Sequence, residues 1–203
     1  MKGLYNPEPD NAIYEVRWHG RGGQGAISSA QILAEAAFFE GFKGVAAAPF
    51  FGAERRGAPV TASTRFSHGT LRVYSQIEHP DIAIVLEEAL LASGGASVGL
   101  KKGGWLIVNS AKHPSELAVE GEFQIATADA LDIAQRLGLL VAGNPIVNTA
   151  LLGAFVRATG LVSLRSVERA LESRFNASAA RLNFEAARLT HDVTVLGSAT
   201  PLP

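Results

Sequence analysis

The amino-acid sequence predicts an α/β fold, arranged as a single three-layer domain with a mostly parallel, mixed sheet and a C-terminal helical segment. A strand, a glycine-rich turn and a helix follow one another between residues 13 and 39. Apolar strand segments then alternate with helical segments up to residue 137, and the pattern beyond residue 143 is helical. Strands that alternate with helices are typical of α/β folds.

The hydrophobic pattern defines the first unit. Residues 13–18 alternate apolar and polar side chains, which is typical of a half-buried strand, and residues 26–39 repeat apolar side chains at spacings of three and four, which is typical of a helix. Gly41 and Gly44 end this helix, and residues 45–50 form a second apolar strand. The two strands are therefore expected to run parallel.

The middle of the chain supplies the remaining strands. Residues 60–66 and 70–77 flank a short turn at Ser67 to Gly69, which predicts a β-hairpin grafted onto the sheet and makes the sheet mixed. Further strands are expected at 81–86, 105–108 and 123–126, and helices at 87–92 and 129–137.

The C-terminal part is helical, with helices expected at 148–159, 166–175 and 177–190. The 203 residues are enough for one sizeable core. We therefore expect an N-terminal extension over residues 1–12, one domain over 13–195 and a C-terminal tail over 196–203.

Composition excludes several classes of protein. The net charge of -1 gives no basic excess, so neither nucleic acid nor a membrane is an expected partner. Charged residues make up only 18% of the chain, which predicts that part of the surface is covered by other subunits. The absence of cysteine excludes disulfides, thiolate nucleophiles and iron–sulfur clusters held by this chain's own cysteines. No signal peptide or membrane-length apolar run is present, which predicts a cytoplasmic protein.

The first candidate site is a glycine loop between the first strand and the first helix. It consists of Gly20, Arg21, Gly22, Gly23, Gln24 and Gly25. Such a loop can bind an anion with its backbone N–H groups and the following helix N-terminus. The segment 45–50 lacks the acid that dinucleotide sites use for ribose, and no lysine with serine or threonine follows the glycines, so NAD and P-loop nucleotide sites are disfavoured. The alternative is a tight turn needed only for packing.

The second candidate site is the loop 51–59, which contains Arg55 and Arg56 and follows the second strand. Ligands of open α/β sheets usually bind at this edge, and two arginines there could grip a phosphate or carboxylate. The alternative is that Glu54 pairs with an arginine while Gly57 and Pro59 shape a turn.

Other polar residues favour structural interpretations. The five histidines lack the spacing of a helical zinc site, and we expect them at the surface or in turns. Glu87 and Glu88 fit a solvated helix start. Asn144 and Asn148 fit a turn around Pro145, although contact with a partner is an open alternative.

The ordered combination of motifs resembles the gamma subunit of pyruvate and ketoisovalerate ferredoxin oxidoreductases. The resemblance rests on residues 19–25 and 52–60 and continues in order through 81–87, 103–109 and 148–154. One departure is Ala58, where family members often have a second glycine. Glu54-Arg55 favours the pyruvate or ketoisovalerate branch over the indolepyruvate branch.

The resemblance implies a subunit of a complex that oxidises a 2-oxo acid to acyl-coenzyme A and CO2. Thiamine diphosphate and Mg²⁺ would then lie between alpha- and beta-type subunits, and a delta-type subunit would carry the [4Fe–4S] clusters and pass electrons to ferredoxin or a flavoprotein. This chain would hold no catalytic residue, metal or cofactor of its own, and its glycine loop with Arg55 and Arg56 would contact coenzyme A or another subunit. Two alternatives are a complex acting on phenylglyoxylate or indolepyruvate with NAD as final acceptor, and a stand-alone module that binds coenzyme A or a nucleotide.

Overall fold

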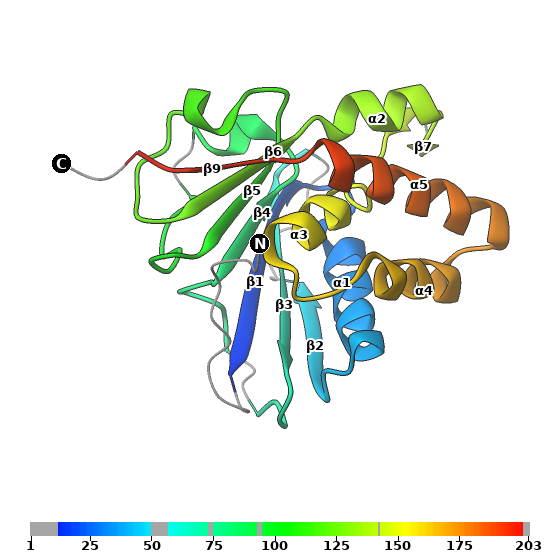
Figure 1. Cartoon of the computed structure of the whole chain (residues 1–203), viewed down its shortest axis with the longest axis horizontal. Coiled ribbons are helices and arrows are strands. Elements are labelled where there is room, and N and C mark those ends of the chain that lie inside the picture. Colours follow the sequence, from blue (N-terminus) through cyan, green and yellow to red (C-terminus); the bar gives the residue numbers. More distant parts are fainter. Residues whose placement is uncertain (1–11, 50–56, 73–74, 93–94, 142, 201–203) are drawn as a thin grey trace.

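The computed structural model describes residues 12–49, 57–72, 75–92, 95–141 and 143–200. Within these residues a seven-stranded sheet has the order β2-β3-β1-β4-β5-β6-β9 (Figure 1). Its strands are β1 (Ile13–Arg21), β2 (Gly44–Pro49), β3 (Pro59–Ser67), β4 (Ile82–Val85), β5 (Trp105–Asn109), β6 (Gln124–Ala128) and β9 (Val195–Ser198). Strands β1, β4, β5 and β6 pair in parallel, whereas β3 and β9 are antiparallel to their neighbours. The predicted α/β fold with a mixed sheet is confirmed.

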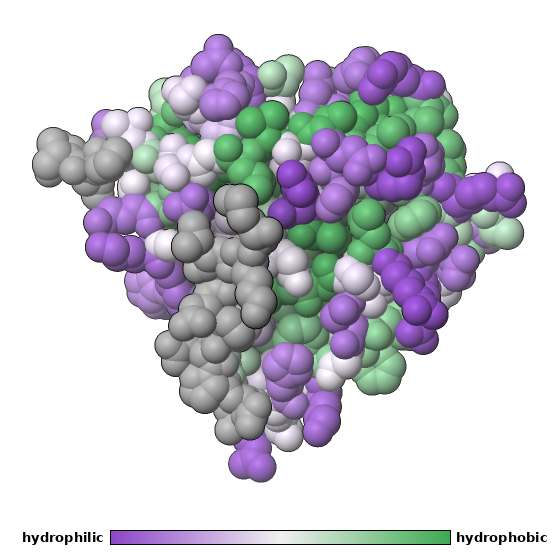
Figure 2. All heavy atoms as spheres, in the orientation of Figure 1, coloured by the Kyte–Doolittle hydropathy of each residue, from purple (hydrophilic) through white to green (hydrophobic). Residues whose placement is uncertain are grey.

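The helices form two tiers against one face of the sheet (Figure 1). Their bounds are α1 (Ala26–Glu40), α2 (Ala130–Leu137), α3 (Leu151–Thr159), α4 (Leu164–Arg174) and α5 (Ala177–Val193). Helix α1 packs on β1, β2 and β3, and α3 packs on β5 and β6, while α4 packs on α1 and α5 packs on α3 and α4. The sheet and the two tiers make three layers. Figure 2 shows apolar side chains at the surface over α3 and beside α2 and α5, between polar ones.

The main core lies between the sheet and the two helices that pack on it, α1 and α3. It contains fully buried Trp18, Phe66 and Phe155. The indole Nε1 of Trp18 donates to Thr64 Oγ1 at 3.0 Å, and this hydroxyl donates to the backbone carbonyl of Ala30 at 2.8 Å. The two bonds join β1, β3 and α1, and they satisfy polar groups that would be costly to bury unpaired.

The second face of the sheet differs between its two halves. On β4, β5 and β6 it carries a second apolar cluster, covered by the 3₁₀ turns η1 (Glu88–Leu90) and η2 (Pro114–Glu116) and by residues 95–100. We call this the apolar half. On β1 and β3 the same face carries alternating polar side chains: Glu15, Arg17, His19, Thr61, Ser63 and Arg65. We call this the polar half.

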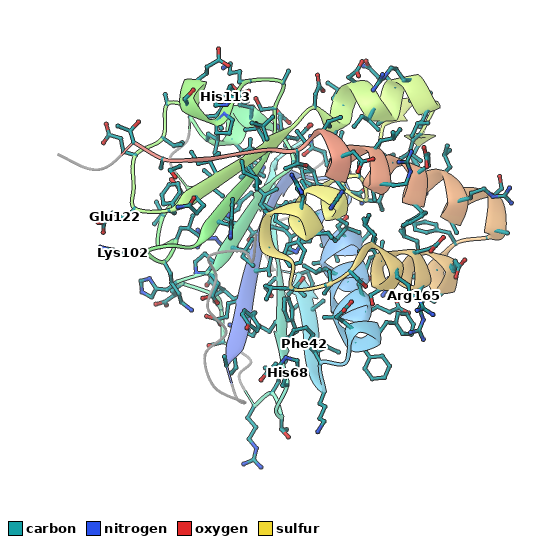
Figure 3. The ribbon with its side chains drawn as sticks, in the orientation of Figure 1. Phe42, His68, Lys102, His113, Glu122 and Arg165 are labelled. Atoms are coloured by element: carbon teal, nitrogen blue, oxygen red, sulfur yellow. The ribbon has the colours of Figure 1, made fainter. Side chains whose placement is uncertain are left out.

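Three expectations from the sequence need correction. The hairpin over 60–77 is wrong, because β3 pairs with β1 on one edge and β2 on the other, and the described residues of 70–77 contain no strand. In the expected turn of that hairpin, the ring of His68 stacks on the ring of Phe42, with the two ring centroids 4.2 Å apart (Figure 3). Residues 87–92 contain a single 3₁₀ turn, and β9 forms where only a tail was expected.

A small two-stranded ribbon follows α2. It consists of β7 (Leu140–Val141) and β8 (Asn144–Pro145), and it leads into α3. Leu140 and Val141 on this ribbon are exposed. No helix among the described residues is long and apolar enough to cross a membrane.

Candidate functional site

The glycine loop lies at the carboxyl end of β1, at the point where the strand order reverses. From β1 the chain crosses through α1 to the β2 side of the sheet, whereas β4 and β5 extend the sheet on the other side. Open α/β sheets bind ligands in the crevice at such a switch point. Here a pocket of about 560 Å³ opens between the glycine loop, the ends of β4 and β5, α2 and the β7–β8 ribbon. We call it the glycine-loop pocket.

Steric contacts favour glycine at two positions of the loop, and the backbone conformation also favours it at Gly25. A Cβ atom on Gly20 would lie 2.8 Å from Leu86 Cδ1. Gly25 has φ of 79° and ends the loop at the start of α1, and a Cβ there would lie 2.3 Å from Asn148 Nδ2. Asn148 is buried, and its Nδ2 donates to the carbonyl of Gly25 at 2.9 Å. The loop is therefore packed tightly against β4 and the segment before α3.

Gln24 and Glu87 hold the loop from within the pocket. The side-chain oxygen of Gln24 accepts from the backbone N–H of Arg21 at 2.7 Å, and its Nε2 donates to Glu87 Oε2 at 2.9 Å. The same carboxylate oxygen accepts from Arg21 Nε at 2.9 Å. Hydrogen bonding from Arg21 lowers the pKa of Glu87, burial opposes this, and the Gln24 amide adds to the lowering. Glu87 is therefore ionised at neutral pH.

The charges that line the pocket cancel. Among the described lining residues, Arg21 and Glu87 are the charged ones, and they pair with each other. The other polar linings are the carboxamides of Gln24, Asn109 and Asn144, and Leu131 and Val141 form part of an apolar rim. Asn109 donates from Nδ2 to the carbonyl of Leu86 at 3.1 Å. An anion entering the pocket would have to compete with Glu87 for Arg21.

The start of α1 has no side-chain cap and no acid. Its N-cap is Gly25, which has no side chain to cap the helix, and its first turn contains no acid. The first N–H groups of a helix have no partner within the helix, and the macrodipole favours negative charge there. The first-turn backbone of α1 is therefore the part of the loop region that can attract a phosphate or carboxylate.

The structure brings the two sequence motifs together. The backbone N–H of Gly22 donates to the carbonyl of Ala58 at 2.9 Å, and that of Gly57 donates to the carbonyl of Gly22 at 3.2 Å. Arg21 Nη1 also donates to the carbonyl of Gly57 at 3.3 Å. The described end of the loop 51–59 thus lies against the glycine loop. Arg55 and Arg56 themselves lie outside the described residues.

The histidine and acid expectations hold only in part. His19 is buried rather than at the surface, and burial together with the positive charge of Arg17 lowers its pKa to about 4. Glu88 accepts hydrogen bonds from Ser110 and Lys112. The described His, Asp and Glu side chains form no group of three or more that could hold a metal ion.

Sequence reasoning missed three residues of this site. Glu87, Asn109 and Asn148 contact the loop or line its pocket from positions 63 or more residues along the chain. The one available signal was position, because Glu87 and Asn109 directly follow expected strands and parallel strands end at one edge of a sheet.

The fold and the position of the loop define an α/β protein with a tightly packed glycine loop at the switch point of its sheet. The model of the family described as pyruvate ferredoxin/flavodoxin oxidoreductase matches residues 15–193. This chain therefore belongs to that family, in which it is a gamma-type subunit of a 2-oxoacid oxidoreductase.

Individual relatives agree with this assignment. The chain is 46% identical over 184 residues to the pyruvate/ketoisovalerate oxidoreductases common subunit gamma of Thermococcus litoralis, which covers 91% of this chain and 98% of that protein. It is 45% identical to the pyruvate synthase subunit PorC of Methanocaldococcus jannaschii, with 89% and 96% covered. The crystal structure of the pyruvate oxidoreductase subunit PORC of Thermotoga maritima superposes with a TM-score of 0.77 at 35% identity, covering 92% of this chain and 99% of that one.

Proposed function

We propose that this chain is the non-catalytic gamma-type subunit of a cytoplasmic, thiamine-diphosphate-dependent complex that converts pyruvate or a branched-chain 2-oxo acid to acyl-coenzyme A and CO2. The observation that carries the proposal is 46% identity over 91% of this chain to a gamma subunit shared by pyruvate and ketoisovalerate oxidoreductases. In this proposal, thiamine diphosphate and Mg²⁺ belong to alpha- and beta-type subunits. The [4Fe–4S] clusters belong to a delta-type subunit, and electrons leave to ferredoxin or a flavoprotein.

We further propose that the glycine loop, Gly20 to Gly25, contacts coenzyme A beside the uncapped start of α1. The uncapped helix start supplies backbone donors for a phosphate, and the carboxamides and apolar rim of the pocket suit the uncharged amide arm. Arg21 is the cation at this site, and the pairing of Arg21 with Glu87 sets how readily it turns to a ligand. Arg55 and Arg56, on the loop that adjoins Gly22, are proposed as further contacts to coenzyme A or to a neighbouring subunit.

The test uses the assembled complex, purified with wild-type or variant forms of this chain. Arg21→Ala should raise the KM for coenzyme A and leave the KM for pyruvate unchanged, because only the coenzyme contact is removed. Glu87→Gln should lower the KM for coenzyme A, because Arg21 loses its internal carboxylate. Arg136→Ala is the matched control, since Arg136 is exposed on α2 and pairs with Asp132 one turn away.

Two results would contradict the proposal. Equal coenzyme A KM values for all four complexes would leave the glycine loop with a packing role only. Full 2-oxoacid oxidation by the other subunits without this chain would show that it is not a required subunit. Tight binding of NAD or FAD to the isolated chain would instead support the alternative of an independent nucleotide-binding module.

A further inference from the structure

A second hollow lies on the polar half of the sheet, on the face away from α1. It is a groove of about 310 Å³ between β2, β3 and residues 75–77. The charged residues among its described linings are Arg17 and Arg65, and the hydroxyls of Thr61, Ser63 and Ser75 surround them. No described acid lines the groove. This composition favours an anionic occupant.

Arg65 carries the strongest signal in this groove. The residue is only 6% exposed, and its Nε donates to Glu15 Oε1 at 2.8 Å. Its Nη2 is shielded from water and has no hydrogen-bond partner in the structure as described. Leaving a charged donor buried without an acceptor is costly, and such groups are rare in native proteins. The Nη edge of this planar fork has the geometry to bind a carboxylate.

The charges around Arg65 do not balance. The cations Arg17, Arg65 and Lys101 face the carboxylates Glu15 and Asp81, and Lys101 Nζ lies 2.9 Å from Asp81 and 3.9 Å from Glu15. Arg17 is bound by neutral acceptors, since its Nε donates to His19 at 3.0 Å and its Nη2 donates to the carbonyl of Val98. Among the described residues these are three cations and two carboxylates, and Arg17 has no carboxylate partner there. A partly buried guanidinium without a carboxylate partner favours a further anion beside it.

We propose that this groove receives an acidic side chain, Asp or Glu, from a neighbouring subunit of the complex, and that the carboxylate binds the Nη edge of Arg65. A carboxylate would supply the acceptor that Arg65 Nη2 lacks, and it fits the volume of the groove. None of the described helices packs on this face of β1 and β3. The proposal rests on the proposed function, because it requires this chain to be one subunit of an assembly.

The first experiment measures how tightly this chain is held in the purified complex. Arg65→Gln should weaken its association with the other subunits about 30-fold or more, the loss typical when one partner of a buried charge pair is removed. The chain should therefore dissociate at a lower salt concentration than the wild-type chain. Lys102→Gln is the matched control, because Lys102 pairs with Glu122 at an exposed site (Figure 3), and it should dissociate like the wild type.

A second variant guards against simple misfolding. Ser63→Asp places a carboxylate inside the groove beside Arg65, so the isolated chain should melt at the same or a higher temperature while its association with the complex weakens. General damage to the fold would instead lower the melting temperature of the isolated chain. A photoreactive p-benzoylphenylalanine at Thr61 should cross-link to a segment of a partner subunit that contains Asp or Glu.

The outcomes separate this inference from the proposed function. If Arg65→Gln and Ser63→Asp complexes dissociate at the same salt concentration as the wild type, the inference is wrong, even though the chain remains a subunit. A cross-link from Thr61 confined to this chain's own residues also overturns it. If the wild-type chain never co-purifies with other subunits, the proposed function itself fails.

Discussion

The two halves of the sheet share one helix-covered face and differ on the other. On the apolar half, Leu106, Val108 and Ile125 are fully buried beneath 3₁₀ turns and loops of the same chain. On the polar half, β1 and β3 present charged and hydroxyl side chains, and Arg65 is buried with an unsatisfied donor. One half is therefore covered by residues of the same chain, and the other carries a buried cation with an unsatisfied donor.

This difference follows the position of the glycine loop. The loop leaves the carboxyl end of β1, at the boundary between the halves, and its pocket extends over the ends of β4 and β5. The apolar half thus provides a rigid base for the pocket. The polar half, on β1 and β3, carries the groove that we propose receives a carboxylate from a partner.

Leu106→Ala should be the most damaging change and would measure the contribution of the apolar half. Leu106 is fully buried in the second apolar cluster, and truncating such a leucine costs about 2–5 kcal/mol through lost burial and the cavity left behind. Urea denaturation of the isolated chain measures the loss. Thr61→Ala, on the partly exposed polar half, should change the free energy of unfolding by less than about 0.5 kcal/mol. Equal losses for the two variants would remove the contrast.

The apolar half was easier to predict from the sequence than the polar half. Strands β4 and β5 are buried on both faces, so they appear as continuous apolar runs, and both were expected. The alternation in β3 identified a strand correctly but could not identify its partners, because side-chain periodicity specifies faces and not neighbouring strands. The expected hairpin was therefore wrong. Strand β9 is short and largely exposed, and no pattern in Val195–Ser198 distinguishes it from a tail.

The site shows the same limit. The spacing of its glycines identified the loop, because tight turns and close packing need glycine at fixed positions. Glu87 and Asn148 were not assigned to it, because their contacts with Gln24 and Gly25 span 63 and 123 residues. Burial of His19 was also missed, since a lone histidine at a strand end carries no signal of what covers it.

His19 gives the polar half a pH-dependent contribution to stability. The pKa of His19 in the folded chain is about 4, below the usual value near 6.5. Between these two pH values His19 is therefore protonated in the unfolded chain and neutral in the folded chain. Stability should therefore fall as the pH drops from about 6.5 to 4, by up to about 3 kcal/mol, and this term should then level off. Urea denaturation of the wild type and His19→Gln across this range checks it. The free energy of unfolding of the wild type, relative to that of His19→Gln, should decrease as the pH falls, and a constant difference would contradict the assignment.

Glu15→Gln would test the internal ion pair of the polar half. The carboxylate of Glu15 accepts from Arg65 Nε at 2.8 Å with its side chain 22% exposed. Its loss leaves Arg65 with a weaker acceptor and should cost about 1–3 kcal/mol at pH 7. Glu122→Gln, at the exposed pair with Lys102, is the control and should cost less than about 0.5 kcal/mol. If the free energy of unfolding falls by the same amount in both variants, the charges of the polar half are as well solvated as an ordinary surface pair.

The smallest effect is expected at Glu87, on the boundary between the halves. Hydrogen bonding from Arg21 lowers the pKa of this carboxyl in the folded chain, so the pair stabilises the fold above the usual pKa of glutamate. That contribution should be lost as the pH falls through the lowered folded pKa. Because the pair is about one third exposed, solvent screening keeps its effect on stability small.

Glu87→Gln should therefore be slightly less stable than the wild type at pH 7 in urea denaturation, and the difference should shrink as the pH falls through the lowered pKa of Glu87. Asp132→Asn, which breaks the exposed pair with Arg136, is the control and should show a smaller difference. A glutamine at position 87 that is as stable as glutamate at pH 7 would mean that the Arg21–Glu87 pair contributes nothing to stability. Arg21 would then be free to turn to a ligand at no cost, and the lower coenzyme A KM expected for Glu87→Gln should also be absent.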